Sequence, residues 1–188
     1  MIPDKIQDYV KVYHNYFSQD FCKSVIASLE TAHWEKHYYY TTAGNHITYD
    51  DDLHMSYEAI PQYDDLHKAV WNIIGQYVKK DLDGFSWFNT WHDCSRIRFN
   101  KYTGGTNMKP HCDHIHSLFD GKEKGVPILS VVASLNDDYE GGEFIMWEDQ
   151  KIDLPAGSIM IFPSNFMYPH GVRTVTSGTR YSFVSWVW

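Results

Sequence analysis

The stretch Lys109-Pro-His-Cys-Asp113 places an imidazole and a carboxylate two residues apart, and Tyr168-Pro-His-Gly171 supplies a second imidazole far downstream. On a small β-rich domain, His111, Asp113 and His170 would form a three-ligand metal site. The His-x-Asp triplet alone is weak evidence, because in a chain with 11 histidines it is expected about once by chance. Whether the triplet belongs to a metal site therefore depends on the sequence around it.

Composition limits the classes of protein to consider. The 188 residues suffice for one domain with its own core. An aromatic content of 16% suits a sheet-rich fold with a lined pocket. The formal charge of −8, without any Lys/Arg run, excludes a general nucleic-acid surface.

The N-terminal residues 1–5 lack the apolar core of a signal peptide, and no window is apolar for long enough to span a membrane. Cys22, Cys94 and Cys112 are odd in number and widely spaced, which fits neither a disulfide framework nor a zinc-type pair. We therefore expect a cytoplasmic protein with no membrane partner.

Hydrophobic periodicity predicts helices first and strands afterwards. Helices are expected over about 18–33, with Ser18 as the N-cap, and from Pro61 to about Asp81. Residues 36–60 read as strand fragments and a long loop, which is either a substrate lid or a solvated connector. Short strands follow at 95–102, 127–135, 142–147, 157–162, 168–175 and 179–187. This order predicts a mainly β fold with buttressing helices.

Two of the predicted strands have a polar face. With period 2, Arg180, Ser182, Val184 and Trp186 share one face, and Arg96, Arg98, Asn100 and Tyr102 share one face of another strand. Both strands flank the proposed metal ligands. The pattern therefore favours a polar-lined barrel mouth over a face that merely meets water.

The second half of the chain contains several short blocks in a fixed order: Tyr102-x-Gly-Gly, Pro110-His-x-Asp113, Leu135-Asn-Asp137 followed by Gly141-Gly-Glu-Phe144, Leu154-Pro-Ala-Gly157 followed by Ile161-Phe162, His170-x-Val172, and Gly178-Thr-Arg180 ending in Trp186. Together these blocks resemble the prolyl-hydroxylase branch of the Fe(II)- and 2-oxoglutarate-dependent dioxygenases, from about residue 95 to the C-terminus, or roughly half the chain. The basic residue that follows the second histidine is often lysine in this family, and here it is Arg180.

The resemblance implies a double-stranded β-helix core, a jelly roll of the cupin-like type, at about 95–188, with N-terminal helices at about 18–82 supporting it in one domain over 1–188. It also implies the roles of the site residues. His111, Asp113 and His170 would hold Fe(II) and be catalytic. Arg180 and Tyr102 would bind 2-oxoglutarate, and Trp186 would line the pocket.

The residue types suit that chemistry. Two neutral imidazoles and a carboxylate leave coordination positions open on non-haem Fe(II). The planar fork of Arg180 matches the distal carboxylate of 2-oxoglutarate. The charges of iron, Asp113, the dianionic co-substrate and Arg180 cancel, as a partly dehydrated cavity requires.

The implied activity is a hydroxylase that couples O₂-driven hydroxylation to conversion of 2-oxoglutarate into succinate and CO₂, with ascorbate as a stimulant. Retention of Asp113 favours hydroxylation, since the related halogenases lack that carboxylate. A peptidyl proline is the natural substrate by analogy, and the acidic surface and the tyrosine-rich 38–60 segment suit a basic or proline-rich peptide. A free amino acid or another small molecule is the alternative.

Two rival functions and one rival residue stay open. A non-redox metal-binding cupin would not need Arg180 for ligand binding. A zinc hydrolase would use His111 with His114 and His116, and would keep its metal without His170. Arg173 competes with Arg180 as the carboxylate ligand. The polar excursion at 117–125 is a second candidate lid.

Overall fold

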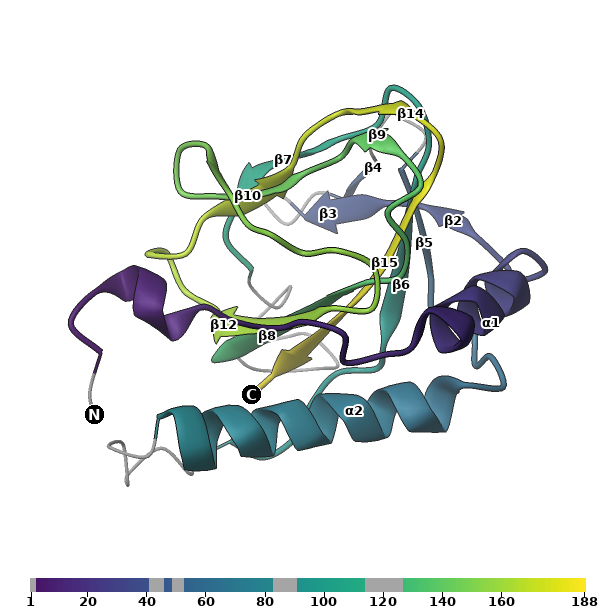
Figure 1. The fold of residues 1–188 in the computed structure, drawn as a ribbon. Coiled ribbons are helices and arrows are strands. Elements are labelled where there is room, and N and C mark those ends of the chain that lie inside the picture. Colours follow the sequence, from purple (N-terminus) through teal and green to yellow (C-terminus); the bar gives the residue numbers. More distant parts are fainter. Residues whose placement is uncertain (1–2, 41–45, 49–52, 83–90, 114–126) are drawn as a thin grey trace.

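The computed structural model describes residues 3–40, 46–48, 53–82, 91–113 and 127–188, and stacks helices, a large sheet and a small sheet in successive layers (Figure 1). The large sheet is antiparallel throughout, in the order β1-β12-β8-β15-β6-β5-β2. Its strands are β1 (Lys11–Tyr13), β12 (Ile159–Pro163), β8 (Leu129–Ser134), β15 (Arg180–Val187), β6 (Arg98–Tyr102), β5 (Leu53–Ser56) and β2 (Glu35–Lys36).

The small sheet faces the large one and follows the order β11-β10-β13-β7. Its strands are β11 (Gln150–Lys151), β10 (Phe144–Met146), β13 (His170–Val172) and β7 (Met108–His111). Two further pairs join β14 (Val175–Ser177) to β9 (Glu140–Gly141) and β3 (Tyr38–Tyr40) to β4 (His46–Thr48). The two facing sheets form the expected double-stranded β-helix.

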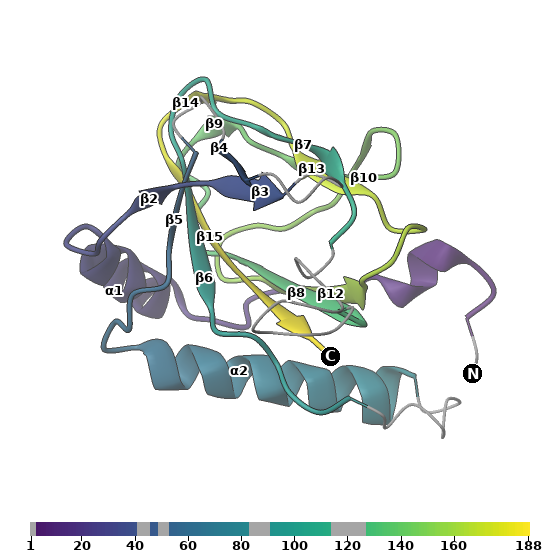
Figure 2. The same cartoon turned by 180° about the vertical axis from the view of Figure 1, so that it is seen from behind.

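Helices cover the outer face of the large sheet, opposite the small sheet (Figures 1 and 2). They are α1 (Gln19–Leu29) and α2 (Tyr63–Gln76), with a 3-10 turn at Ile6–Tyr9 and a π-turn at Tyr77–Asp81. Their apolar stripes join the large sheet in one buried core that includes Val25, Leu29, Leu66, Val70, Ile73, Phe99, Val131, Ile161 and Phe183. Among the described helices, none is long and apolar enough to cross a membrane.

The side-chain alternation of the central strands decides what faces inward. Val131 and Ala133 of β8 pack toward the helices, whereas Val132 joins a second core between the sheets. That second core contains Tyr102, Met108, Phe144, Met160, Phe162 and Val172. In β15, Phe183 lies on the helix side, so Arg180 and Ser182 point between the two sheets, into the site described below.

The predicted elements are largely present, with several corrections. The first helix ends at Leu29 rather than near His33, because the Trp34 indole donates to the Leu29 carbonyl (3.0 Å) and the Thr31 hydroxyl to that of Ser28 (3.2 Å). The strand fragments expected over 36–60 are confirmed by β3, β4 and β5, and both β5 and β2 lengthen the large sheet.

The predicted strand at 168–175 is two shorter strands, β13 and β14, which pair with different partners. Strand β7 was not predicted, because Lys109 and Pro110 interrupt any apolar alternation. Among the described residues, no disulfide involves Cys22, Cys94 or Cys112. The 117–125 excursion and parts of 38–60 lie outside the described residues, so the lid predictions stay predictions.

Candidate active site

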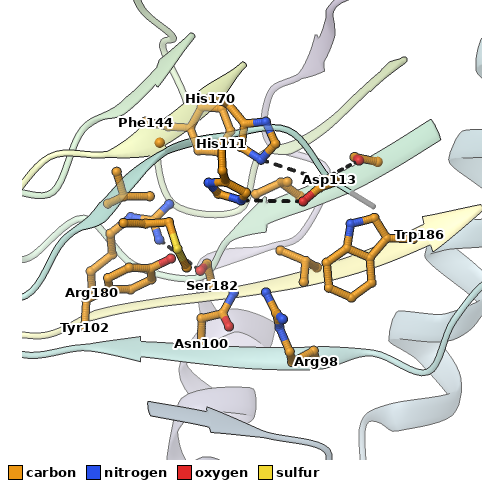
Figure 3. Close-up of a pocket in the computed structure, with 16 residues that line it drawn as sticks. Arg98, Asn100, Tyr102, His111, Asp113, Phe144, His170, Arg180, Ser182 and Trp186 are labelled. Atoms are coloured by element: carbon orange, nitrogen blue, oxygen red, sulfur yellow. Dashed lines mark hydrogen bonds and ion pairs between the residues drawn. The ribbon is translucent and has the colours of Figure 1, made fainter. Parts of the chain in front are cut away.

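Strand pairing brings the two predicted histidine ligands together. In the β7·β13 ladder His111 lies directly opposite His170, and their ring centroids are 4.5 Å apart. Gly171 permits this approach, because a Cβ there would lie 2.7 Å from the Met108 carbonyl oxygen. Asp113 follows β7 by two residues, with its carboxylate oxygens 3.5 Å from His111 Nε2 and 3.6 Å from His170 Nε2 (Figure 3). The three ligand atoms all lie within 4.8 Å of one another.

Backbone carbonyls fix which ring nitrogens face the centre. His111 Nδ1 lies 2.9 Å from the Lys109 carbonyl oxygen, and His170 Nδ1 lies 3.1 Å from that of Tyr168. A carbonyl only accepts hydrogen bonds, so each Nδ1 carries a proton and donates it. Each Nε2 then faces Asp113 and is the ring nitrogen left to bind a metal.

Aromatic packing holds the His170 ring in place. Phe144 stacks on it at 5.4 Å between centroids with planes 14° apart, and Phe162 meets it edge-on at 5.1 Å. Burial lowers the pKa of His170 despite the opposing effect of Asp113. The ring therefore stays neutral at neutral pH, as metal coordination requires.

Asp113 is held ionised by its surroundings. Burial would raise its pKa, but the His170 and His111 rings and a hydrogen bond from Ser130 together lower it well below its ordinary value. The Ser130 hydroxyl donates to the carboxylate at 2.6 Å and lies 2.9 Å from Ser164 Oγ. Ser130 thus orients the Asp113 carboxylate that would coordinate the metal.

Ser130→Ala is expected to weaken metal binding without removing a ligand. Losing the hydroxyl that orients a ligating carboxylate costs about 10- to 100-fold in metal affinity. Titration with Mn(II) should show this loss, whereas Ser134→Ala should bind like the parent. Ser134 is a buried serine of the same strand, but its hydroxyl bonds to the Asn136 carbonyl instead. Equal affinities for both variants would contradict the role given to Ser130.

Strand β15 of the large sheet supplies the pocket with a buried cation. Arg180 is 2% exposed, lies across from Tyr102 in the β15·β6 ladder, and places its guanidinium carbon 5.1 Å from the Tyr102 ring centre. Its Nη1 donates to Ser182 Oγ at 2.9 Å, while its buried Nε has no hydrogen-bond partner. Among the described residues, no carboxylate forms an ion pair with it. Burying a charge without an ion-pair partner is costly unless an anion binds to it.

Tyr102 adds a neutral donor at this end. Burial raises its pKa, against the lowering influence of Arg180 and Arg98. The phenol therefore keeps its proton and can donate a hydrogen bond to an anion held by Arg180.

The structure sorts the remaining predicted residues. Trp186 lines the pocket at the end away from Arg180, as does Arg98 from the neighbouring strand β6, and Asn100 lies between the two ends (Figure 3). Arg96 precedes β6 and points elsewhere, donating to the Tyr57 carbonyl at 2.9 Å. Arg173 is exposed and paired with Asp149 at 2.7 Å, so the rival to Arg180 lies outside the pocket. His114 and His116 lie outside the described residues.

The pocket fits both groups that the resemblance implies. Two imidazoles and an ionised carboxylate converge on one point, which is the donor set of a 2-His-1-carboxylate iron site. The unsatisfied Arg180 Nε and the protonated Tyr102 match the free carboxylate of 2-oxoglutarate. One cavity is lined by all six predicted site residues: His111, Asp113, His170, Arg180, Tyr102 and Trp186.

Sequence reasoning missed several functional neighbours. Ser130, Phe144 and Phe162 approach the ligands only through the fold. A weak signal for Ser130 was a hydroxyl on the inward face of a mostly apolar strand. His37 was also missed. It is 4% exposed, and burial, with smaller contributions from Arg98 and His111, lowers its pKa to about 3.

His37 predicts a pH dependence of stability. Its ordinary pKa is 6.5, so as the pH falls below that value the imidazole becomes protonated in the unfolded chain but stays neutral in the folded protein. The contribution of neutral His37 to stability is therefore fully present above pH 6.5 and declines toward pH 3. Between pH 7 and pH 5 the loss is about 2 kcal/mol. Urea unfolding at both pH values should show a smaller loss for His37→Gln; an equal loss would contradict this assignment.

The fold and the triad together define a double-stranded β-helix with a 2-His-1-carboxylate centre. Residues 97–188 match the model of the 2OG-Fe(II) oxygenase superfamily. This part of the chain, just under half of its length, is similar to that superfamily.

Curated relatives match about half of the chain. A PKHD-type hydroxylase of Stenotrophomonas maltophilia (strain R551-3) is 36% identical over 95 residues, which are 48% of this chain and 41% of the relative. The PKHD-type hydroxylase PiuC of Pseudomonas aeruginosa is 34% identical over 94 residues, 47% of this chain and 41% of PiuC. The matched segment thus spans about two fifths of the length of these curated relatives.

Two solved structures resemble almost the whole chain in fold. The viral collagen prolyl hydroxylase vCPH of Paramecium Bursaria Chlorella virus-1 covers 95% of this chain and 94% of its own, with a TM-score of 0.64 and 13% identity. A Pseudomonas putida prolyl-4-hydroxylase covers 95% and 91%, with a TM-score of 0.64 and 16% identity. The N-terminal half, which the family model does not match, therefore shares their architecture.

Proposed function

We propose that residues 1–188 act as one Fe(II)- and 2-oxoglutarate-dependent dioxygenase domain that hydroxylates its substrate. The observation that carries the proposal is a buried arginine that has no carboxylate partner within the described part of the chain. It lies in the pocket where two histidines and an ionised aspartate converge. A metal site alone would fit many functions. A metal site with a buried cation and a phenol donor fits a co-substrate that has a free carboxylate.

The residues have distinct tasks in this proposal. His111, Asp113 and His170 hold Fe(II), and Arg180 and Tyr102 bind the distal carboxylate of 2-oxoglutarate. When bound, these two groups supply the activation of O₂, with 2-oxoglutarate converted to succinate and CO₂. The phenylalanines around His170 keep its ring fixed and limit the access of water to it. Ser130 keeps the Asp113 carboxylate in position.

For the substrate, we propose a prolyl residue of a peptide, by analogy with the solved neighbours. These include a Trichoplax adhaerens prolyl hydroxylase in complex with a hypoxia-inducible factor peptide, which is 14% identical with a TM-score of 0.64. A free amino acid is the second candidate, and the second arginine of the pocket, Arg98, favours it. Ascorbate as a stimulant and a reducing, cytoplasmic environment complete the proposal. The odd number and wide spacing of the cysteines support this environment.

Succinate formation tests the function directly. Purified protein with Fe(II), ascorbate, O₂ and 2-oxoglutarate should release succinate slowly without substrate and faster with it. A mass increase of about 16 Da on candidate peptides or amino acids, as hydroxylation adds one oxygen, would identify the target. No succinate release, together with no binding of 2-oxoglutarate, would reject the dioxygenase and leave the non-redox metal protein.

A further inference from the structure

The pocket contains a second arginine that the co-substrate does not account for. Arg98 lies on β6 opposite Val184 of β15, whereas Arg180 lies opposite Tyr102 in the same ladder. The two arginines are therefore four residues apart along the ladder, or roughly 13 Å. Figure 3 shows Arg180 and Tyr102 at one end of the pocket and Arg98 and Trp186 at the other, with Asp113 and His111 across from them.

Arg98 is oriented by an aromatic ring rather than by an acid. Its guanidinium carbon lies 4.7 Å from the Trp186 ring centre, and its buried Nε has no hydrogen-bond partner. Among the described residues, no carboxylate forms an ion pair with it. Stacking of this kind fixes the plane of a guanidinium and leaves the donors at its edge available to a ligand.

Arg98 also changes the charge balance of the pocket. The charges of iron, Asp113, 2-oxoglutarate and Arg180 already cancel, so Arg98 leaves one positive charge in excess. His37, the buried imidazole influenced by Arg98, stays neutral near pH 7 and neither adds to this charge nor compensates it. A partly buried excess charge in this pocket favours an anion from outside the protein.

We propose that Arg98, fixed by Trp186, binds a carboxylate of the substrate and so selects an anionic substrate for the metal centre. The inference rests on the proposed dioxygenase function and narrows its substrate class. A carboxylate fits the planar fork of arginine through two parallel hydrogen bonds. It comes either from a free amino acid or from an acidic side chain in a peptide, and the test separates these sources.

The test uses full-length protein loaded with Mn(II) and 2-oxoglutarate, and measures binding rather than turnover. Three sets of probes are titrated by saturation-transfer NMR: the free L-amino acids, their C-terminal amides, and the blocked peptides acetyl-Gly-Asp-Gly-amide and acetyl-Gly-Glu-Gly-amide. The proteins are the parent, Arg98→Met, Arg98→Lys and Arg96→Met. Arg96 is a matched control, because it also stacks on an aromatic ring, Tyr57, but lies outside the pocket.

The parent should bind at least one carboxylate-bearing probe about 10- to 100-fold more tightly than the uncharged counterpart. Arg98→Met should lose that preference, Arg98→Lys should keep part of it, and Arg96→Met should match the parent. Preference for a free amino acid over its amide identifies the first source, and binding of an acidic peptide identifies the second.

The outcomes separate this inference from the proposed function. If the parent binds 2-oxoglutarate but no probe shows a carboxylate preference, the inference is wrong and the dioxygenase stands. The same holds if Arg98→Met retains the preference. If the parent does not bind 2-oxoglutarate, the proposed function itself fails. If Arg98→Met loses 2-oxoglutarate while Arg180→Met retains it, Arg98 holds the co-substrate instead and the inference is overturned.

Discussion

Replacing Arg180 with methionine is expected to raise the dissociation constant for 2-oxoglutarate by at least about 100-fold, because breaking a buried ion pair costs roughly 3–5 kcal/mol. Arg180 is 2% exposed, and the described residues provide no other cation at its end of the pocket. The variant leaves the co-substrate carboxylate buried with only the Tyr102 hydroxyl as a donor. Isothermal titration of 2-oxoglutarate into Mn(II)-loaded protein measures the loss.

Two controls make this result interpretable. Arg173→Met removes an exposed arginine whose partner is Asp149, so its affinity for 2-oxoglutarate should equal that of the parent. In the absence of ligands, Arg180→Met should not unfold more easily than the parent, because the side chain removed is a buried cation without a carboxylate partner. A large loss in Arg173→Met, or none in Arg180→Met, would reverse the choice between the two arginines.

Removing His170 should have a comparably large effect on the metal. His170→Ala deletes one of the three ligands, so Mn(II) affinity should fall by more than the ~10- to 100-fold that follows the loss of an outer partner. The 2-oxoglutarate affinity measured with Mn(II) should fall with it, since the proposed co-substrate site includes the metal. Equilibrium dialysis with Mn(II) and with Zn(II) provides the measurement.

The same variant decides against the hydrolase alternative. A zinc site built from His111, His114 and His116 predicts that His170→Ala keeps its metal and His116→Ala loses it. The cross-strand pairing of His111 with His170 predicts the reverse. Retention of Zn(II) by His170→Ala at parental affinity would show that the metal is held elsewhere.

The inward-facing residues of the central strands were predictable because strands alternate. Counting by twos from Arg180 reaches Ser182, Val184 and Trp186, and these side chains line the pocket. Counting by twos back from Tyr102 also correctly predicts that Asn100 and Arg98 line the pocket. The prediction is wrong for Arg96, because strand β6 begins only at Arg98. The HxD triplet and a distant histidine also meet as expected, because β7 and β13 are neighbours.

Other features depend on contacts between segments far apart in sequence. Ser130 reaches Asp113, and His37 comes under the influence of Arg98 and His111, only after the sheets have formed. Strand β5 joins the large sheet beside β6, although its surroundings read as irregular. The excess charge of Arg98 could not be recognised from sequence, because an inward-facing arginine usually meets an acid, and only the fold shows its partners.

A crystal structure of the protein with Mn(II) and 2-oxoglutarate tests the central claim most directly. The predicted result is an anomalous peak for Mn(II) bounded by Nε2 of His111, the Asp113 carboxylate and Nε2 of His170, with the distal carboxylate of 2-oxoglutarate on Arg180 and Tyr102. Metal bound away from these three side chains, or a co-substrate carboxylate resting on Arg98 or Arg173 instead, would contradict the account.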